Sequence, residues 1–401
     1  MRRSPRQLLA GIARHAFPRV RRSVARALAV AALPGALPIA LPGALAAQQG
    51  VATWRATEVW RVDGTEGGEP FFDLRDFVVS KDGGVWALDF KDQVIRRFDA
   101  NGTPLPNVSR KGAGPGELGN ANGLVIAADG RVWVNDPRNS RLTVFGLDGK
   151  FVSQHVIPIR GYGWRWDAWL DRSSGRIVDP FTSQKPGGTY TQEWRRIAAD
   201  GTIRDTLPIP SCPSGAAPVY SGFQAETKGK GNTYRQYPFS NGGGTAPDGR
   251  GAMWCAVPAS ARVALVRIGT NDTIAQTTVT LSPIPVVPAE RREAIAEAEK
   301  AIAQYATNNF DASKIPATKP PIAQLTVDED GRLWVQHTAR FGDTSVTFDV
   351  HDPAGKHLGR LRLPTRPSLS GLPVRARGND VWLAVRDEDD VVGIARYRLT
   401  R

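Results

Sequence analysis

Two stretches of the chain share one pattern of residues: "DGGVWALDFKDQVIRRFDANG" (Asp82–Gly102) and "DGRVWVNDPRNSRLTVFGLDG" (Asp129–Gly149). Each begins with an Asp-Gly turn, continues with an apolar segment that contains Trp, and crosses a polar loop into a second apolar segment that ends at another glycine turn. Apolar segments bounded by such turns are typical of antiparallel strands. Because the turn glycines Gly83 and Gly130 lie 47 residues apart, the two stretches are units of an internal repeat.

The unit returns four more times, which makes six in all. Gly331 and Gly378 are again 47 residues apart, whereas the steps from Gly175 to Gly249 and from Gly249 to Gly331 are longer and carry insertions. Four strands are expected in the first unit, at 75–79, 85–89, 94–99 and 103–109. Four-stranded units at a period of about 45 residues predict an all-β fold, a six-bladed β-propeller. The later copies are "SGRIVDPF" from Ser174, "GAMWCAV" from Gly251, "DGRLWVQH" from Asp330 and "NDVWLAV" from Asn379.

The two ends of the repeat array complement each other. The last unit ends after "GIARYRL" (393–399), so its fourth strand is missing. The segment "TWRATEVWRV" (Thr53–Val62) precedes the first unit and belongs to none. A closed ring leaves no exposed strand edges, so we expect the N-terminal segment to supply the missing outer strand.

One blade resembles a known repeat family. The run "GAGPGELGNANGLVIAADGRVWVNDPRNSRLTVFGLDGKF" (112–151) is similar to an NHL repeat, the blade unit of six-bladed propellers in the TolB-like structural group. The matching pieces are the Gly-Pro-Gly-Glu start, Asp129-Gly130, the segment 133–136, the segment 139–141 and Val144-Phe145. The preceding blade lacks the Asn and Ser of that loop, and the other blades keep only a Gly-x-apolar-Trp core. The resemblance implies an exported bacterial propeller, of a kind that includes both binding proteins and lactonases or lyases with a metal over the central channel.

The N-terminal residues predict export. Residues 1–26 hold eight arginines and no acidic residue, and an Ala/Leu-rich run up to Ala47 follows, which is the pattern of a signal peptide. Three prolines in that run argue against a membrane-spanning helix, although an uncleaved anchor is the alternative. Of the formal charge of +13, +5 then remains on residues 51–401, the predicted single propeller domain. The absence of a basic block speaks against nucleic acid, and we expect a monomer, either periplasmic or secreted.

Cysteines and insertions add further expectations. Cys212 and Cys255 can pair in only one way, and an exported chain favours a disulfide over two buried free thiols. The first insertion, about 210–231, reads as a long ordered loop. The second, about 286–318, contains a helix that begins at Pro288. The stripe of Ile295, Ala298, Ile302 and Tyr305 is expected to pack on the propeller as a partial lid, with a partner-binding helix as the alternative.

The predicted strand order places the short turns on one face and the longer loops on the other, where function is expected. The crossing into the third blade is rich in Tyr, Trp and Arg, the residue types that anchor interfaces. Polar residues at the inner strands and loop ends could line a funnel, and a ring of carboxylates there could hold Ca²⁺. The candidate ligand-binding residues are Arg75, Asp76, Asp136, Arg138, Tyr162, Trp164, Arg165, Asp179, His337, Arg340 and Arg386.

Other chemistry has weak support in the sequence. "RKGAGPGELGNANG" (Arg110–Gly123) resembles a phosphate-binding loop, but Glu117 occupies the third glycine position, and a matching "DGTEGGEP" precedes the first blade. The stretch is therefore interpreted as a crossing between blades. His351 and His357 face each other on a predicted hairpin, but two histidines make a poor metal site. No cofactor is expected, with a channel Ca²⁺ ion as the exception.

Two functions remain open. The first is a non-catalytic binding module that recognises a protein, peptide or glycan on the loop-rich face, favoured by the absence of a recognisable catalytic set and by the aromatic and Arg-rich crossing. The second is a metal-dependent propeller enzyme, of the lactonase, hydrolase or lyase kind, acting over the central channel. Fold alone does not decide between them.

Overall fold

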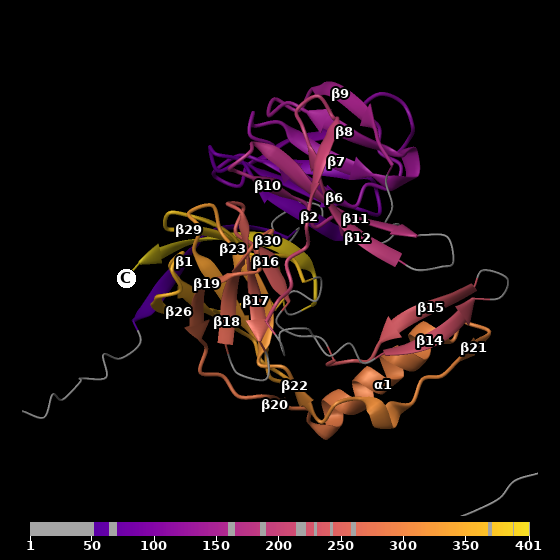
Figure 1. The fold of residues 1–401 in the computed structure, drawn as a ribbon, viewed down its shortest axis with the longest axis vertical. Coiled ribbons are helices and arrows are strands. Elements are labelled where there is room, and N and C mark those ends of the chain that lie inside the picture. Colours follow the sequence, from indigo (N-terminus) through magenta and orange to yellow (C-terminus); the bar gives the residue numbers. More distant parts are fainter. Residues whose placement is uncertain are drawn as a thin grey trace, which may run out of the picture. The chain divides into compact units, whose positions relative to one another are not determined.

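In a computed structural model of the chain, small antiparallel sheets follow one another along the sequence (Figure 1). Residues Gln49–Arg401 form one compact unit. The predicted signal peptide, 1–47, lies outside the described residues, as do Tyr162 and Trp164. The structure describes residues 52–63, 70–158, 165–184, 190–213, 222–227, 231–240, 244–257, 262–367, 371–387 and 389–400.

Four sheets have four strands each, paired in the order in which the strands occur in the sequence. The first contains β2 (Leu74–Val79), β3 (Val85–Asp89), β4 (Val94–Phe98) and β5 (Pro104–Val108), and the second β6 (Gly123–Ile126), β7 (Val132–Asp136), β8 (Arg141–Phe145) and β9 (Phe151–Val156). The third contains β10 (Trp169–Asp171), β11 (Arg176–Gln184), β12 (Tyr190–Ile197) and β13 (Ile203–Leu207). The fourth contains β16 (Thr245–Pro247), β17 (Ala252–Val257), β18 (Arg262–Arg267) and β19 (Thr273–Thr278).

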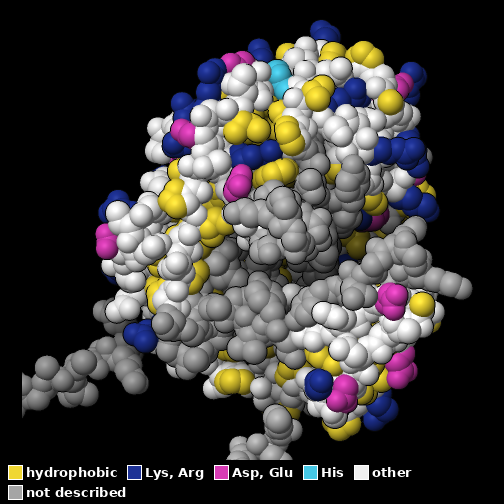
Figure 2. Space-filling model, turned by 45° about the vertical axis from the view of Figure 1, so that its right-hand side comes forward, with side chains coloured by type: hydrophobic (Ala, Val, Ile, Leu, Met, Phe, Trp, Pro, Cys, Tyr) yellow, Lys and Arg dark blue, Asp and Glu magenta, His cyan; other side chains and the backbone are white. Residues whose placement is uncertain are grey.

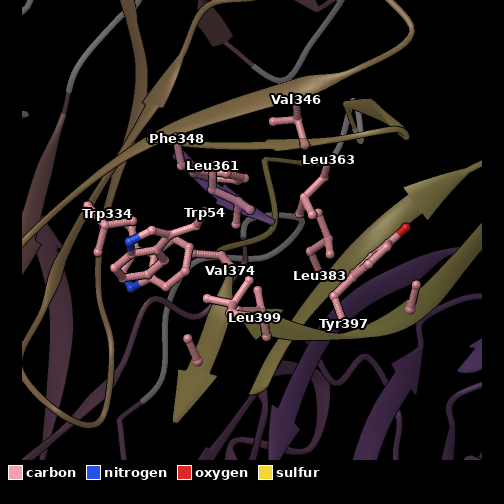
Figure 3. Close-up of a cluster of buried hydrophobic side chains, with 14 of the residues drawn as sticks. Trp54, Trp334, Val346, Phe348, Leu361, Leu363, Val374, Leu383, Tyr397 and Leu399 are labelled. Atoms are coloured by element: carbon pink, nitrogen blue, oxygen red, sulfur yellow. The ribbon is translucent and has the colours of Figure 1, made fainter. Parts of the chain in front are cut away.

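The N-terminal strand β1 (Thr53–Val62) joins the two last groups of strands into one larger sheet. It pairs antiparallel with the C-terminal strand β30, as the sequence predicts, and its first residues also run parallel to β26. Trp54 of β1 lies edge-on to Trp334, with 6.4 Å between ring centroids, inside an apolar cluster (Figure 3). The two groups are β23 (Ile322–Val327), β24 (Leu333–His337), β25 (Val346–His351) and β26 (His357–Leu363), then β27 (Arg366–Pro367), β28 (Arg375–Arg377), β29 (Asp380–Arg386) and β30 (Val392–Thr400).

The turn chemistry explains why these segments fold back on themselves. At the turn between β2 and β3, Gly83 has φ +90°, and at the turn between β6 and β7, Gly130 has φ +84°. A side chain is strained in that region, so a glycine in each unit fixes the tight turn. The strands that follow are buried along their whole length, because β3 and β7 lie between other strands of their sheets. The arrangement is mostly β and consistent with a β-propeller.

The two insertions pack against each other. Of the predicted loop at about 210–231, residues 222–227 form a strand, β14 (Gly222–Thr227), while 214–221 and 228–230 lie outside the described residues. β14 pairs with β15 (Gly231–Gln236) and with β21 (Thr307–Asn308) of the second insertion. The helix α1 (Pro288–Ile302) begins at Pro288 as predicted and lies beside this hairpin (Figure 1). Its stripe residues Ile295 and Ile302 contact Phe223 and Tyr237, so the predicted lid packing on the propeller is wrong for these side chains.

The remaining short elements connect the insertion to the sheets. They are β20 (Ile284–Pro285), which pairs with β22 (Thr318–Lys319), and the 3₁₀ turn η3 (Ala312–Lys314); a second 3₁₀ turn, η1 (Pro137–Asn139), lies apart from them between β7 and β8. Lys319 donates to Glu290 of α1 and to the Ala339 carbonyl, both at 2.6 Å, and so anchors the start of the helix beside β24. Among the described helices, none is long and apolar enough to cross a membrane.

The first strands of the sheets surround one cavity of about 250 Å³. Residues of β2, β6, β10, β16, β23 and β28 all contribute to its lining. These strands are thus the inner strands, and the hydrophobic clusters lie between neighbouring sheets, as in the cluster that joins Trp86 and Leu88 to Leu124 and Val134.

Candidate functional site

The strand order separates two sides of the described structure. The turns that follow first and third strands are tight, as at Ser80–Gly84 and at Gly146–Lys150, each closed by backbone hydrogen bonds of 2.8 to 2.9 Å. The loops that follow second strands, and the crossings between sheets, lie at the opposite strand ends because neighbouring strands are antiparallel. We call these the turn side and the loop side. The loop side includes residues 90–93, 137–140 and 338–345 between second and third strands.

The loop side exposes aromatic and cationic groups. Phe72, at the start of the first sheet, is 58% exposed, and the Lys91 ammonium lies 4.4 Å from the centroid of its ring. Phe341, in the loop after β24, is 44% exposed. The predicted residues Arg138 and Arg340 are both exposed in loops of this side. Sequence reasoning missed both phenylalanines, although the dipeptide Phe71-Phe72 next to a strand signalled that one ring faces the core and the other solvent.

The three predicted carboxylates, Asp76, Asp136 and Asp179, are buried and accept hydrogen bonds. Asp136, at the end of β7, accepts the backbone N–H groups of Gly119 and Asn120 at 2.9 Å each. Asp89, 47 residues earlier, accepts those of Phe72 and Asp73 in the same way. This recurring carboxylate holds the crossing that enters each of the two sheets, so Asp136 has a structural task that its residue type did not reveal.

Asp179, in the third sheet, is likewise buried and accepts hydrogen bonds from neighbouring residues. One oxygen accepts the indole N–H of Trp166 at 2.7 Å, and the other accepts the Nε–H of Arg195 at 2.9 Å. Asp179, Trp166 and Arg195 are all buried. The pair therefore fastens the aromatic crossing to its sheet instead of presenting a charge to solvent, and Trp166 packs in the interior as large aromatic residues usually do.

Asp76 is buried at the inner strand β2 and touches two other inner strands. Its Oδ2 accepts the Leu124 N–H of β6 at 2.8 Å, and its Oδ1 lies 3.5 Å from Nη2 of Arg375 on β28. Burial raises the pKa of Asp76, although the charge of Arg375 acts in the opposite direction. Arg375, which sequence reasoning missed, has its pKa lowered by burial. The two charges form a loosely paired couple beside the cavity.

The predicted arginines are held in place by neighbours. Arg75 lies over the ring of Phe90, 3.8 Å from its centroid, and pairs with Asp73 at 2.9 Å. Arg165 donates from Nε to Asp167 at 2.8 Å and from Nη1 to the Gly371 carbonyl at 3.2 Å. Arg386 pairs with Asp390 at 3.1 Å.

The Gly371 carbonyl also accepts a hydrogen bond from the amide of Gln324, at 3.1 Å. Arg165 precedes β10, Gln324 lies on β23 and Gly371 precedes β28. Arg165 and Gly371 are 206 residues apart in the sequence, so no local sequence pattern could predict the hydrogen bond between them. The three residues link the loop-side ends of three inner strands.

His337 belongs to a cluster inside one sheet. Its Nε2 lies 2.9 Å from Oδ2 of Asp349, and His357 Nε2 lies 3.3 Å from Oδ1. Arg360 donates to both oxygens of the same carboxylate. Burial opposes ionisation of Asp349, but hydrogen bonds from His337 and Arg360 outweigh it, and the pKa lies well below its usual range. With Arg360 on the carboxylate, this cluster is an ion-pair network across β24, β25 and β26.

The described residues do not assemble a metal site. Nowhere in the ranges given above do three or more His, Cys, Asp or Glu side chains gather closely enough to hold an ion. His351 and His357 do pair across β25 and β26, as the sequence predicts, with ring centroids 5.0 Å apart. On the described face in Figure 2, Lys and Arg side chains are scattered among acidic and apolar ones.

No family model and no curated protein matches the sequence. Solved structures do resemble the chain. Virginiamycin B lyase from Staphylococcus aureus is 14% identical, with 86% of this chain and 99% of that chain covered and a TM-score of 0.41. A putative exported protein from Bacteroides fragilis is 10% identical, with coverages of 87% and 96% and a TM-score of 0.46. The Swd1 β-propeller domain from Myceliophteria thermophila is 10% identical, with coverages of 86% and 100% and a TM-score of 0.41. Likenesses this low transfer no activity, ligand or residue role to this chain.

Proposed function

We propose that the chain is an exported β-propeller binding module that recognises a protein, peptide or glycan through its loop side. The observation that carries this proposal is the exposure of Phe72 and Phe341 together with the cationic groups of Lys91, Arg138 and Arg340. Large exposed aromatic rings cost free energy in water, and aromatic and Arg side chains are the usual anchors of binding interfaces. Short tight turns occupy the other side.

The architecture that we propose is a closed ring of six blades, of the NHL-like kind. Two observations support six. The inner strands β2, β6, β10, β16, β23 and β28 line one cavity, and β1 adds the fourth strand to the group of β28, β29 and β30. A ring closed by both chain ends leaves no blade edge unpaired at the junction.

The metal-dependent enzyme is the weaker alternative. It requires several carboxylates free to bind an ion over the channel. Asp76, Asp136 and Asp179 instead accept hydrogen bonds from backbone N–H groups, Trp166, Arg195 and Asn139. Releasing any of them to a metal leaves buried donors without acceptors, which costs about 1–3 kcal/mol per group. This favours a binding role.

Export is supported by the bond between Cys212 and Cys255, because disulfides persist in oxidising compartments. The bond fixes the start of the first insertion to the buried strand β17. A periplasmic or extracellular location agrees with the signal peptide that residues 1–47 predict. N-terminal sequencing of the protein recovered from the periplasm and from the medium tests both the cleavage and the compartment.

The binding proposal is tested by selecting ligands and mapping them. The protein is screened against a random-peptide display library and a glycan array, and the dissociation constants of the selected ligands are measured for Phe72→Ala, Phe341→Ala and Arg138→Ala. We expect each selected ligand to lose about tenfold or more in affinity with at least one of them, since hot-spot truncations cost 2 kcal/mol or more.

Lys150→Ala on the turn side is the control, because Lys150 is also exposed and lies in a short turn. Ligands whose affinity depends on Lys150 but on none of the loop-side residues would contradict the proposal. A stoichiometric divalent ion that is lost in Asp76→Asn or Asp136→Asn would favour the enzyme.

A further inference from the structure

The walls of the cavity between the inner strands are partly apolar. Its volume of about 250 Å³ is slightly below the usual range of small-molecule pockets. Leu124, Ile126, Val327 and Val374 contribute to the walls from two inner strands, β6 and β23, and from the residue before a third, β28. A cavity of this size and lining suits a compact ligand with an apolar body.

More cationic than acidic side chains line the cavity, and each of the acidic side chains already accepts hydrogen bonds from other residues of the protein. Glu329 accepts from Arg377 at 2.6 Å, and Asp248 accepts the backbone N–H groups of Arg250 and Ala252. Asp328 pairs with Arg332 at 2.6 Å outside the lining. The charged lining residues are four cations, Lys81, Arg172, Arg375 and Arg377, and three carboxylates, Asp248, Asp328 and Glu329.

Two of the cations are exposed in the turns at the cavity mouth. Lys81 lies in the turn between β2 and β3, and Arg172 lies in the turn between β10 and β11. Neither forms an ion pair with a residue that the structure describes. Both side chains therefore add positive potential at the mouth, where it attracts anions.

Arg375 is the cation deeper in the cavity. Its Nε donates to the Phe77 carbonyl at 3.2 Å, and its closest carboxylate oxygen, in Asp76, is 3.5 Å from Nη2. A guanidinium has five N–H donors, so these contacts leave donors available. The side chain is 35% exposed and lines the cavity, so part of it faces the cavity space. Burial lowers the pKa of Arg375, and the charge of Asp76 acts in the opposite direction.

The two ends of the inner strands differ. On the loop side of Arg375, the carbonyl of Gly371 binds both Arg165 and Gln324 and thereby ties three strand ends together. On the turn side, Lys81, Ala128 and Arg172 are exposed and line the cavity. A ligand therefore enters the cavity from the turn side, with its anionic group directed toward Arg375.

We propose that this cavity binds a small organic carboxylate with an apolar body, whose carboxylate pairs with Arg375 and whose body packs against the walls. A planar guanidinium matches a carboxylate in geometry, and the pairing gains strength away from bulk water. Lys81 and Arg172 guide the anion to the mouth. This site is on the opposite side from the proposed macromolecular interface and is independent of it, so either can fail without the other.

The test uses phenylacetate as the probe and 2-phenylethanol as its neutral counterpart. Binding to the mature protein is measured by calorimetry and by saturation-transfer NMR. We expect phenylacetate to bind about tenfold or more tightly than the alcohol, because hydrogen bonds to a charged group supply that difference. Equal affinity for the two compounds, or no phenylacetate binding up to about 10 mM, would overturn the proposal.

Variants locate the site. Arg375→Lys keeps the charge beside Asp76 but loses the planar fork, and it should weaken phenylacetate by about tenfold. Ala128→Trp, at an exposed rim position, should block the mouth and abolish binding without disturbing the buried strands. Lys150→Ala, in a turn that does not line the cavity, is the control and should bind normally. Unchanged phenylacetate binding by both Arg375→Lys and Ala128→Trp would exclude this cavity.

Discussion

The carboxylate of Asp76 accepts the backbone N–H of Leu124, with 2.8 Å between oxygen and nitrogen. Asp76 lies on β2 and Leu124 on β6, so this bond joins the inner strands of two consecutive sheets. The same carboxylate faces Arg375 of β28 at 3.5 Å. One buried side chain thus connects three inner strands, and inner strands that make no ladder hydrogen bonds to each other depend on such links.

Replacing Asp76 by Ala is expected to lower the free energy of unfolding by about 2–4 kcal/mol. The Leu124 N–H loses its acceptor in a buried position, and Arg375 loses its closest counter-ion. Urea unfolding followed by Trp fluorescence measures the change. Asp76→Asn should cost less, because the amide oxygen still accepts from Leu124. A loss of under about 1 kcal/mol in Asp76→Ala would contradict this role.

The disulfide between Cys212 and Cys255 closes a loop across a separation of 43 residues. A loop of this length corresponds to about 4 kcal/mol of chain entropy removed from the unfolded state. Wild-type protein should therefore lose several degrees in Tm when dithiothreitol is added. The double variant Cys212→Ala, Cys255→Ala should start at the lower Tm and not respond to the reductant. A reductant effect in the double variant would point to a cause other than this bond.

The repeat could be predicted because its turn residues and its apolar strand residues are close together in the sequence. The first sheet follows the expected strands within about two residues, and β3 has the predicted bounds Val85–Asp89. Its turn at Gly83 and its apolar residues are neighbours in sequence, so turn chemistry and strand pattern agree without knowledge of the rest of the chain. The pairing of Cys212 with Cys255 also required no geometry, because no other partner exists.

Contacts between segments that are far apart in the chain could not be predicted from the sequence. The sequence identified Asp136 as polar and near a loop, but its residue type does not tell a free ligand from an acceptor of the Gly119 N–H. The helix stripe at Ile302 was recognised as a burial signal, yet its partner Phe223 lies far upstream in another insertion. An amphipathic stripe reports that a helix packs, and not what it packs against.

Phe223→Ala is expected to loosen the insertion unit while the sheets remain folded. Phe223 lies 5.2 Å from the Tyr237 ring and 5.1 Å from the Phe310 ring, in a cluster separate from those of the sheets. Truncating a buried Phe costs about 3–5 kcal/mol. Hydrogen exchange should show faster exchange in β14 and α1 and unchanged protection in β7. The exposed Phe341→Ala serves as the control, and equal loss of protection in β7 would show that the insertion and the sheets unfold together.

The unfolding free energy should fall as the pH drops from about 6.5 to 5, and His351 should account for part of that loss. Its ring is 1% exposed, with Nδ1 beside Thr277 Oγ1 at 3.1 Å and the Gly355 carbonyl at 3.3 Å. Burial lowers its pKa, and the neighbouring His357 adds to the effect. Below pH 6.5, His351 therefore binds a proton more readily in the unfolded chain than in the folded one. Its contribution to the free energy of unfolding is fully present above the unfolded pKa of about 6.5 and is lost as the pH falls below it.

Urea unfolding at several pH values measures this slope, which reaches at most about 1.4 kcal/mol per pH unit for one proton. His351→Phe removes the titrating ring from the buried site and should flatten the slope between pH 6.5 and 5. The pKa of His155 is also lowered by burial, so His155→Gln is the comparison that separates the two contributions. The nearby Asp349 has a depressed pKa, and its contribution is lost only below about pH 4, outside this window. A slope that persists undiminished in His351→Phe would refute the assignment to this residue.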